Sequence, residues 1–200
     1  MRGANINRKE FTFIEGTPLR CSLFWNDDLF SFLLEKGADP NCGDLRPLTG
    51  AAGLNSETAL AKVKLLVEKG ADINSADSTS PCDTPLHTAA RTGIAETADY
   101  LLSQQAKVDE KNTYDQTPLH VAFAAYRNPE SSADEKDRRL RVIAVLLAHS
   151  NKHRISTAFD EVCSEFVRKL SEVDYENLQL RFGPVLKLKI EKLRSSRGAG

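Results

Sequence analysis

The feature of this sequence that most constrains its fold is a four-residue string that occurs twice, as Thr84-Pro85-Leu86-His87 and Thr117-Pro118-Leu119-His120, 33 residues apart. Two partial copies precede them, Thr17-Pro18-Leu19-Arg20 and Arg46-Pro47-Leu48-Thr49. A threonine hydroxyl can cap the free N–H groups at a helix start, and proline at the first helical position loses no hydrogen bond. The string therefore predicts where helices begin, and its period predicts a stack of repeats.

A second phrase marks the other end of each unit. It reads Gly37-Ala38-Asp39-Pro40-Asn41, then Gly70-Ala71-Asp72-Ile73-Asn74 and, in a decayed copy, Gln105-Ala106-Lys107-Val108-Asp109. The glycine at position 70 follows an apolar run, where a residue in the left-handed conformation ends a helix at little cost. This phrase predicts a helix end followed by a turn.

The stretch between the two phrases of the third unit predicts a pair of short helices. Neither helix could bury its apolar face alone, so neighbouring units must stack to form a continuous core. Function is then expected to be spread along a surface. Apolar residues mark the two helices on either side of Gly93: Leu86, Ala89 and Ala90 before it, and Ala98, Leu101 and Leu102 after it.

Residues 16–149 resemble the ankyrin repeat family, whose unit is a β-turn followed by two antiparallel helices and carries the Thr-Pro-Leu-His signature. The resemblance implies an all-α ankyrin repeat solenoid. The first unit lacks the histidine, the second has Arg46 in place of the capping threonine, and the fourth is interrupted. We predict the four units at residues 16–41, 42–75, 76–110 and 111–150.

The two ends of the chain depart from the repeat. Gly3-Ala4-Asn5-Ile6-Asn7 resembles an end phrase and lies 34 residues before Gly37, so we interpret residues 1–15 as the tail and finger of a preceding repeat. Either that unit has degenerated to its tail or the sequence is cut from a longer protein, and we prefer the second reading. Residues 151–200 are predicted to be a helical cap or the start of a further domain, because a terminal repeat needs its open end covered.

Within that C-terminal segment, apolar residues recur at helical spacing from Ile155 to Leu170 and predict a helix of about four turns. Residues 178–193 carry both strand-like and helix-like patterns, and we prefer a helix because a helical stack offers no sheet to join. The segment ends with Lys187, Lys189 and Lys192, so an acidic partner or a membrane surface is the alternative to a simple cap.

The composition bounds the function. The formal charge of −1 supplies no global attraction to nucleic acid or anionic membranes. No apolar run reaches the roughly 18 residues that a membrane span needs, and the N-terminus lacks the apolar stretch of a secretory signal. Four cysteines sit singly at wide intervals, at positions 21, 42, 82 and 163, which favours a reducing compartment, the cytosol or nucleus. A protein delivered into a host cytosol would share these features.

No catalytic or metal-binding pattern stands out. We interpret His87 and His120 as helix-start residues bonded to nearby backbone, and His149 and His153 as solvated, instead of as zinc ligands. Cys163 flanks an apolar helical stripe and is interpreted as core filler. Phosphate-binding glycine loops are missing from the sequence. We therefore predict no enzyme activity, no catalytic residues, no cofactor and no metal.

The resemblance to ankyrin repeats implies that a partner meets the fingers and the concave groove. We favour Trp25, Arg91 and Tyr114, because binding energy concentrates in such side chains. The alternative for Trp25 is that it packs under residues 11–14. The complete set of predicted partner-binding residues is Trp25, Arg91, Thr92, Lys111, Tyr114, Gln116 and Tyr126, with Phe24, Gly53, Leu54, Ser80, Asp83 and Thr113 at comparable positions.

Residues 126–139 interrupt the fourth unit between its two helices. Pro129 and the neighbouring serines predict a loop, and the mixed charges that follow predict a solvated helical extension. Long loops in compact repeats are often functional. A tolerated surface insertion is the alternative, and we prefer it.

We therefore predict a monomeric, non-catalytic protein-binding module with a protein partner and no small-molecule substrate. The alternative is a partner-recruiting part of a larger enzyme or effector, and an effector that acts inside a eukaryotic cell is compatible with the degenerate units. A nucleic-acid binder would show strongly salt-dependent affinity and is disfavoured by the near-neutral charge.

Overall fold

The computed structural model describes residues 5–8, 16–79 and 81–150. The predictions made for residues 1–4, 9–15 and 151–200 and for Ser80 lie outside this range. The described residues contain eight helices: α1 Pro18–Trp25, α2 Asp27–Glu35, α3 Pro47–Ala52, α4 Ala59–Glu68, α5 Pro85–Thr92, α6 Ala95–Ser103, α7 Pro118–Tyr126 and α8 Ala133–Ser150.

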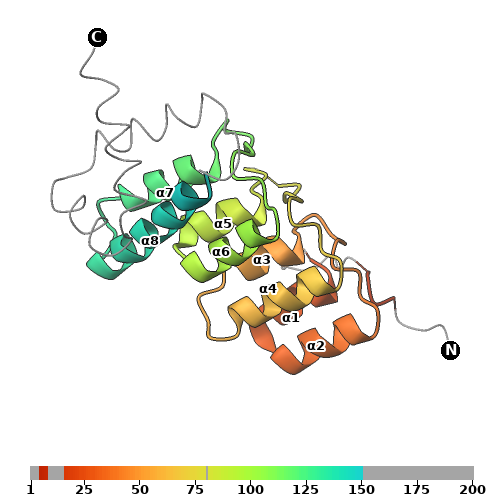
Figure 1. Ribbon diagram of the computed structural model, residues 1–200. Coiled ribbons are helices and arrows are strands. Elements are labelled where there is room, and N and C mark those ends of the chain that lie inside the picture. Colours follow the sequence, from red (N-terminus) through yellow and green to blue (C-terminus); the bar gives the residue numbers. More distant parts are fainter. Residues whose placement is uncertain (1–4, 9–15, 80, 151–200) are drawn as a thin grey trace, which may run out of the picture.

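The helices form four successive pairs that stack in sequence order (Figure 1). The first helices of the pairs, α1, α3, α5 and α7, contact one another in that order, and α4, α6 and α8 do the same in a second layer. Leucine, valine and alanine side chains fill the space between the layers, including Leu48, Leu86 and Leu101, all nearly fully buried. This arrangement confirms the all-α repeat solenoid predicted from the two phrases.

The first phrase starts helices as predicted. Thr84 and Thr117 each accept a hydrogen bond from the backbone N–H three residues later, and the histidine there accepts one back from the threonine N–H. Both histidines are thus helix-start residues bonded to nearby backbone, which confirms that interpretation. Arg46 makes no side-chain cap at the start of α3, where the string has lost its threonine.

The second phrase ends helices with a residue in the left-handed region. Gly37 and Gly70 have φ angles of +84° and +88°, which glycine adopts without steric cost. Gln105 stands at the same position of the decayed copy and has φ +68°. The sequence lost the glycine there, but the backbone kept the conformation.

An asparagine at the end of each phrase links it to the next unit. The Asn41 side-chain oxygen accepts from the N–H of Asp72 at 2.8 Å, and that of Asn74 accepts from the N–H of Lys107 at 2.9 Å. Asn7 makes the same bond, since its side chain accepts from the N–H of Asp39 at 2.9 Å. The geometry gives Asn7 the role of Asn41 and Asn74, which supports the interpretation of residues 5–7 as an end phrase.

The insertion in the fourth unit is a short loop followed by an extension of α8. The helix starts at Ala133, so the charged residues are helical, as the pattern indicated. The prediction that they are solvated is wrong for Arg138 and Arg139, which are half-buried. A Cβ at Gly93 would lie 3.2 Å from Cβ of Arg138, so the bare glycine lets α8 pack closely against the α5–α6 turn.

Candidate functional site

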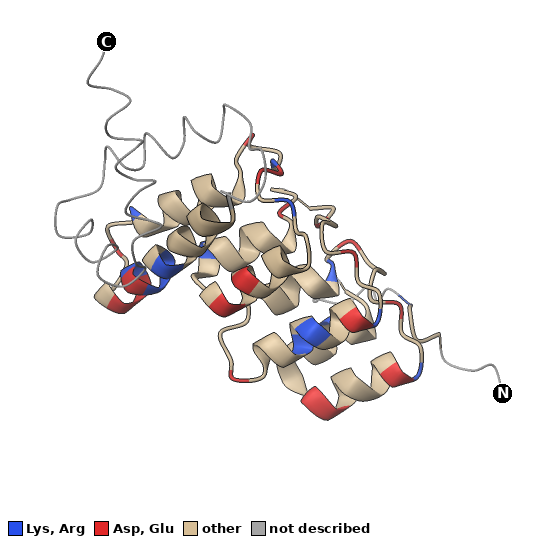
Figure 2. Cartoon of the chain, in the orientation of Figure 1, with Lys and Arg blue, Asp and Glu red and all other residues tan. Residues whose placement is uncertain are grey.

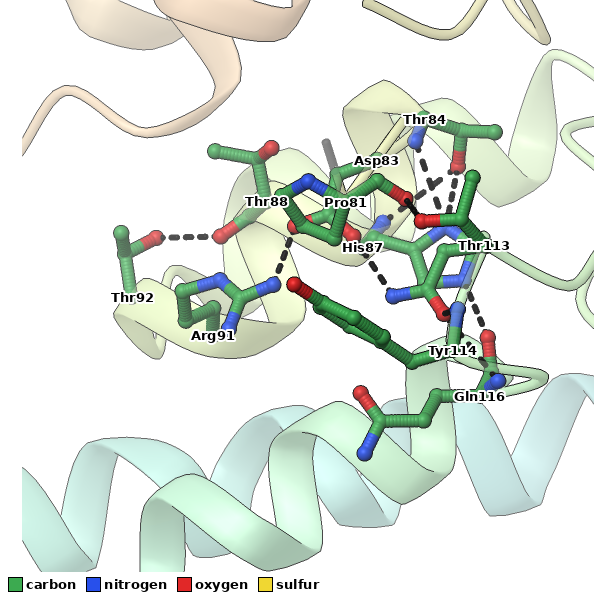
Figure 3. A network of polar contacts seen from close by, with 11 residues as sticks. Pro81, Asp83, Thr84, His87, Thr88, Arg91, Thr92, Thr113, Tyr114 and Gln116 are labelled. Carbon is green, nitrogen blue, oxygen red and sulfur yellow. Dashed lines mark hydrogen bonds and ion pairs between the residues drawn. The ribbon is translucent and has the colours of Figure 1, made fainter. Parts of the chain in front are cut away.

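Most of the predicted partner-binding positions fall into two neighbouring groups that share helix α5. The first group, which we call the finger cluster, consists of Asp83, Arg91, Thr113, Tyr114 and Gln116 (Figure 3). The second group lines a hollow of about 290 Å³ between α1, α3 and α5, which we call the inter-helix hollow. Its lining includes the predicted residues Phe24, Gly53, Leu54 and Thr92.

Asp83 is the centre of the finger cluster. Its side chain is only 9% exposed, and its carboxylate pairs with the guanidinium of Arg91 and accepts a hydrogen bond from the side-chain amide of Asn112 at 2.9 Å. The carboxylate fixes Arg91, whose side chain nevertheless stays 47% exposed. Arg91 is therefore a positioned cation with free surface toward solvent.

Tyr114 is presented by a rigid finger. The Asn112 side-chain oxygen accepts from the backbone N–H groups of Tyr114 and Gln116 at 3.0 and 3.1 Å. Thr113 ties the finger to the preceding one, because its N–H and its hydroxyl both donate to the carbonyl of Pro81. Tyr114 itself is 65% exposed, and its side chain points toward Arg91 in Figure 3.

His87 lies beneath this cluster and is used structurally. Its Nδ1 accepts from the N–H of Thr84 at 3.3 Å, so the ring proton is on Nε2, which donates to the carbonyl of Gln116 at 2.8 Å. Burial lowers the pKa of His87 and keeps the ring neutral. Both nitrogens are occupied, which leaves this histidine no free atom for catalysis.

The inter-helix hollow has a charged floor and an apolar rim. Arg20 and Asp77 contribute the charges, and Phe24 and Leu54 contribute apolar surface. Burial lowers the pKa of Arg20, an effect opposed by the nearby Asp77. Burial likewise raises the pKa of Asp77, against the hydrogen bond from Arg46 N–H and the charge of Arg20. Arg20 and Asp77 are therefore two partly buried groups of opposite formal charge.

The other predicted residues differ in their exposure. Trp25 is 76% exposed at the last residue of α1, and residues 11–14, which the alternative places over it, lie outside the described residues. The sequence Asn26-Asp27-Asp28 that follows is typical of a polar turn, but Asn26 ends α1 and caps α2, whose first turn contains Asp27 and Asp28. The exposed Trp25 therefore stands at a direct junction of two helices.

Lys111 and Tyr126 do not join the two groups. Lys111 pairs with the exposed Asp115 at 2.8 Å, and Tyr126 is partly buried against the hydrophobic core.

His149 is not solvated as predicted, because its side chain is 18% exposed and its Nε2 lies 3.6 Å from the carboxylate of Asp99 on α6. Among the described residues, no cluster of three or more His, Cys, Asp or Glu could hold a metal ion.

Sequence reasoning missed Arg20, Gly50 and Asp77 in the hollow. A signal for Arg20 was present, because it replaces the histidine of the helix-start string in the first unit. In units three and four that histidine caps the start of its own helix, whereas the Arg20 side chain is long enough to reach the next unit. Asp77 lies in a finger with no fixed phrase around it, and nothing in its local sequence marks it.

Residues 48–132 match the family model described as ankyrin repeats in three copies. These residues belong to the ankyrin repeat family, and the fold of the described chain is an ankyrin repeat solenoid. Ankyrin repeats are in general protein–protein interaction modules and are typically non-catalytic.

A human protein, "Ankyrin repeat and SOCS box protein 18", is similar to part of the chain. The two are 39% identical over 89 residues, which make up 44% of this chain and 18% of that protein. The chain thus spans less than a fifth of the length of this relative. In the part of the chain that the structure describes, no helix has the length and apolar character needed to cross a membrane.

Proposed function

We propose that the described repeats bind a protein partner through a continuous strip made of the finger cluster, the inter-helix hollow and the adjoining Trp25. The observation that carries the proposal is the pairing of a buried carboxylate, Asp83, with a half-exposed guanidinium, Arg91, beside the exposed Tyr114. The network fixes these side chains before any partner arrives. Preorganised contact residues lose less entropy on binding.

The side chains of the strip are of the kinds that dominate protein interfaces. Trp25, Phe24 and Tyr114 are 76%, 50% and 65% exposed, although aromatic residues are usually well buried. Tryptophan, tyrosine and arginine are the residues whose removal most often costs binding energy. An exposed set of this composition fits a partner surface better than it fits solvent.

The strip supports binding more than chemistry. The buried titratable groups in and beneath the finger cluster are bonded to side chains or to backbone: Asp83 to Arg91 and Asn112, and His87 to the carbonyl of Gln116. Acidic and basic residues are interspersed along α4 and α8 (Figure 2), which offers no one-sign surface for nucleic acid. A non-catalytic module in the cytosol or nucleus, monomeric by itself, is the proposal that these features favour.

A second candidate is a recruiting part of a larger protein. The similarity to only a fraction of a longer human relative favours it. An effector that acts in a host cytosol is one form of this candidate. Both candidates use the same strip, so one experiment tests the binding common to them.

The experiment is quantitative affinity purification from eukaryotic cytosol with the full chain as bait. The double variant Arg91→Ala/Tyr114→Ala is compared with Arg141→Ala/Phe32→Ala, which removes one half-exposed arginine and one half-exposed aromatic outside the strip. We expect the strip variant to lose its specific partners, and the control to keep them. Equal retention by both variants would refute the strip.

A further inference from the structure

The inter-helix hollow holds a guanidinium in an unusual place. Arg20 stacks on the ring of Phe24, with its Cζ 4.6 Å from the ring centroid. The group also lies across α3 at Gly50, where an added Cβ would be 2.5 Å from Cζ of Arg20. Glycine at this position is therefore what makes room for the guanidinium at the floor of the hollow.

The guanidinium keeps hydrogen-bonding capacity in the hollow. Its Nε is buried and has no hydrogen-bond partner among the described residues. Because protein atoms cover Nε, an acceptor brought into the hollow would pair with the terminal NH₂ groups of Arg20, a residue that lines the hollow. Arginine has five N–H donors and no acceptor, so its partner must be a hydrogen-bond acceptor.

Asp77 is the complementary group, because its carboxylate only accepts hydrogen bonds. Its carboxylate lines the same hollow and accepts the N–H of Arg46 at 2.6 Å. A carboxylate has about four lone-pair sites, so Asp77 can accept a further N–H donor. The floor of the hollow thus combines one group that only donates with one that only accepts, and the two formal charges cancel.

We propose that the hollow is a specificity pocket for an uncharged side-chain amide, asparagine or glutamine, carried by the partner segment. The amide oxygen accepts from Arg20, and the amide NH₂ donates to Asp77. This inference rests on the proposed function, since it assigns a chemical preference to one part of the binding strip.

Other side chains fit the hollow less well. A carboxylate would sit beside Asp77, and a lysine or arginine would sit beside Arg20, so each would meet a like charge. A purely aliphatic side chain would remove water from both charged groups without replacing their hydrogen bonds. The methylene groups of glutamine or asparagine, in contrast, can pack on Phe24 and Leu54 at the rim.

The experiment selects 12-residue peptides from a random display library on the full chain. Gly53 has φ −93°, which any residue adopts, but an added Cβ would lie 2.9 Å from Cγ2 of Thr88, so leucine fills the hollow only as the Thr88 side chain shifts. The selected peptides are measured on wild type, Arg20→Met, Gly53→Leu and Arg91→Ala/Tyr114→Ala. Melting temperatures show whether each variant is folded, and Arg20→Met keeps the hollow open if Gly53→Leu unfolds.

We expect one peptide position to be enriched in asparagine or glutamine. Replacing that residue by alanine should weaken binding to wild type about tenfold, the size typical of a hydrogen bond to a charged group. On Arg20→Met the same replacement should change affinity less than about twofold, because the partner of the amide is gone.

Three results would overturn the inference: enrichment of acidic or basic residues at that position, an equal loss on wild type and Arg20→Met, or no enrichment of any peptide. If the selected peptides lose affinity for Arg91→Ala/Tyr114→Ala but not for Gly53→Leu, the amide pocket is refuted and the proposed binding strip is retained. Peptides that bind every variant equally would contradict both.

Discussion

The Nε2 atom of His87 in the third unit donates to the backbone carbonyl of Gln116 in the fourth unit, at 2.8 Å. The same ring accepts the N–H of Thr84 through Nδ1, so one neutral imidazole both caps α5 and joins two repeats. His87, which the sequence offers as a candidate metal ligand, therefore has a structural role in the repeat stack.

This arrangement predicts a pH dependence of stability. Burial lowers the pKa of His87 in the folded state below its ordinary value of about 6.5. The neutral ring contributes its full stability above that value, and the contribution is lost as the pH falls through the folded pKa, because the unfolded state binds the proton first. Urea unfolding at pH 7.5 and 5.5 should show a larger loss for wild type than for His87→Gln. Equal losses would contradict the assignment.

The decayed end phrase predicts a stabilising substitution. Gln105 holds φ +68°, a conformation that costs a residue with a Cβ roughly 1–2 kcal/mol. Gln105→Gly should therefore raise the free energy of unfolding by about 0.5–1 kcal/mol after the larger backbone entropy of unfolded glycine is allowed for. Gln104→Gly is the matched control, because Gln104 has φ −89° and should gain nothing. Thermal unfolding measures both.

The anchor of the finger cluster should be costly to remove. Asp83→Ala leaves the Asn112 amide without its buried partner and releases Arg91, so we expect a loss of about 2 kcal/mol in the free energy of unfolding. Asp115→Asn removes the charge of an exposed partner of Lys111, keeps a residue type that tolerates the φ of +58° at this position, and should cost less than about 0.5 kcal/mol. If chemical denaturation gave similar values for the two, the cluster would not be the rigid support described above.

The asparagine links predict that Asn7 belongs to the stack. Asn7→Ala should lower the free energy of unfolding by about 0.5–1.5 kcal/mol, because it loses one side-chain bond to the next phrase. Asn41→Ala loses two such bonds, to Asp72 and Gly70, and should lower it at least as much. Asn55→Ala, at an exposed residue between α3 and α4, serves as the control. A value for Asn7→Ala that matched the control would remove the N-terminal phrase from the folded array.

The fold was readable from the sequence because its signals are local. Thr84, Thr117, Gly37 and Gly70 each impose a backbone state through their own side chain or lack of one. The exposed Trp25 and Tyr114 were also found, since position in the repeat sets exposure. The direct α1–α2 junction was missed because Asn26 can both end one helix and cap the next, which a turn-like sequence does not reveal.

The hollow could not be predicted in the same way. It depends on Arg20, Gly50 and Asp77, which lie in three different units and meet only after the units stack. In the sequence, Gly50 is only a weak helix former within a short helix. That it leaves space for the guanidinium of Arg20 from another helix is seen only in the structure. The half-burial of Arg138 beside Gly93 was missed for the same reason.

The most direct test of the central claim is site-specific photo-crosslinking in eukaryotic cytosol. A photoreactive amino acid is placed at Tyr114 in one variant and at Ser103, exposed on α6 outside the strip, in another. The account predicts that the protein retained by the wild-type chain crosslinks at position 114 and not at position 103. Crosslinking of that protein at position 103 alone would contradict it.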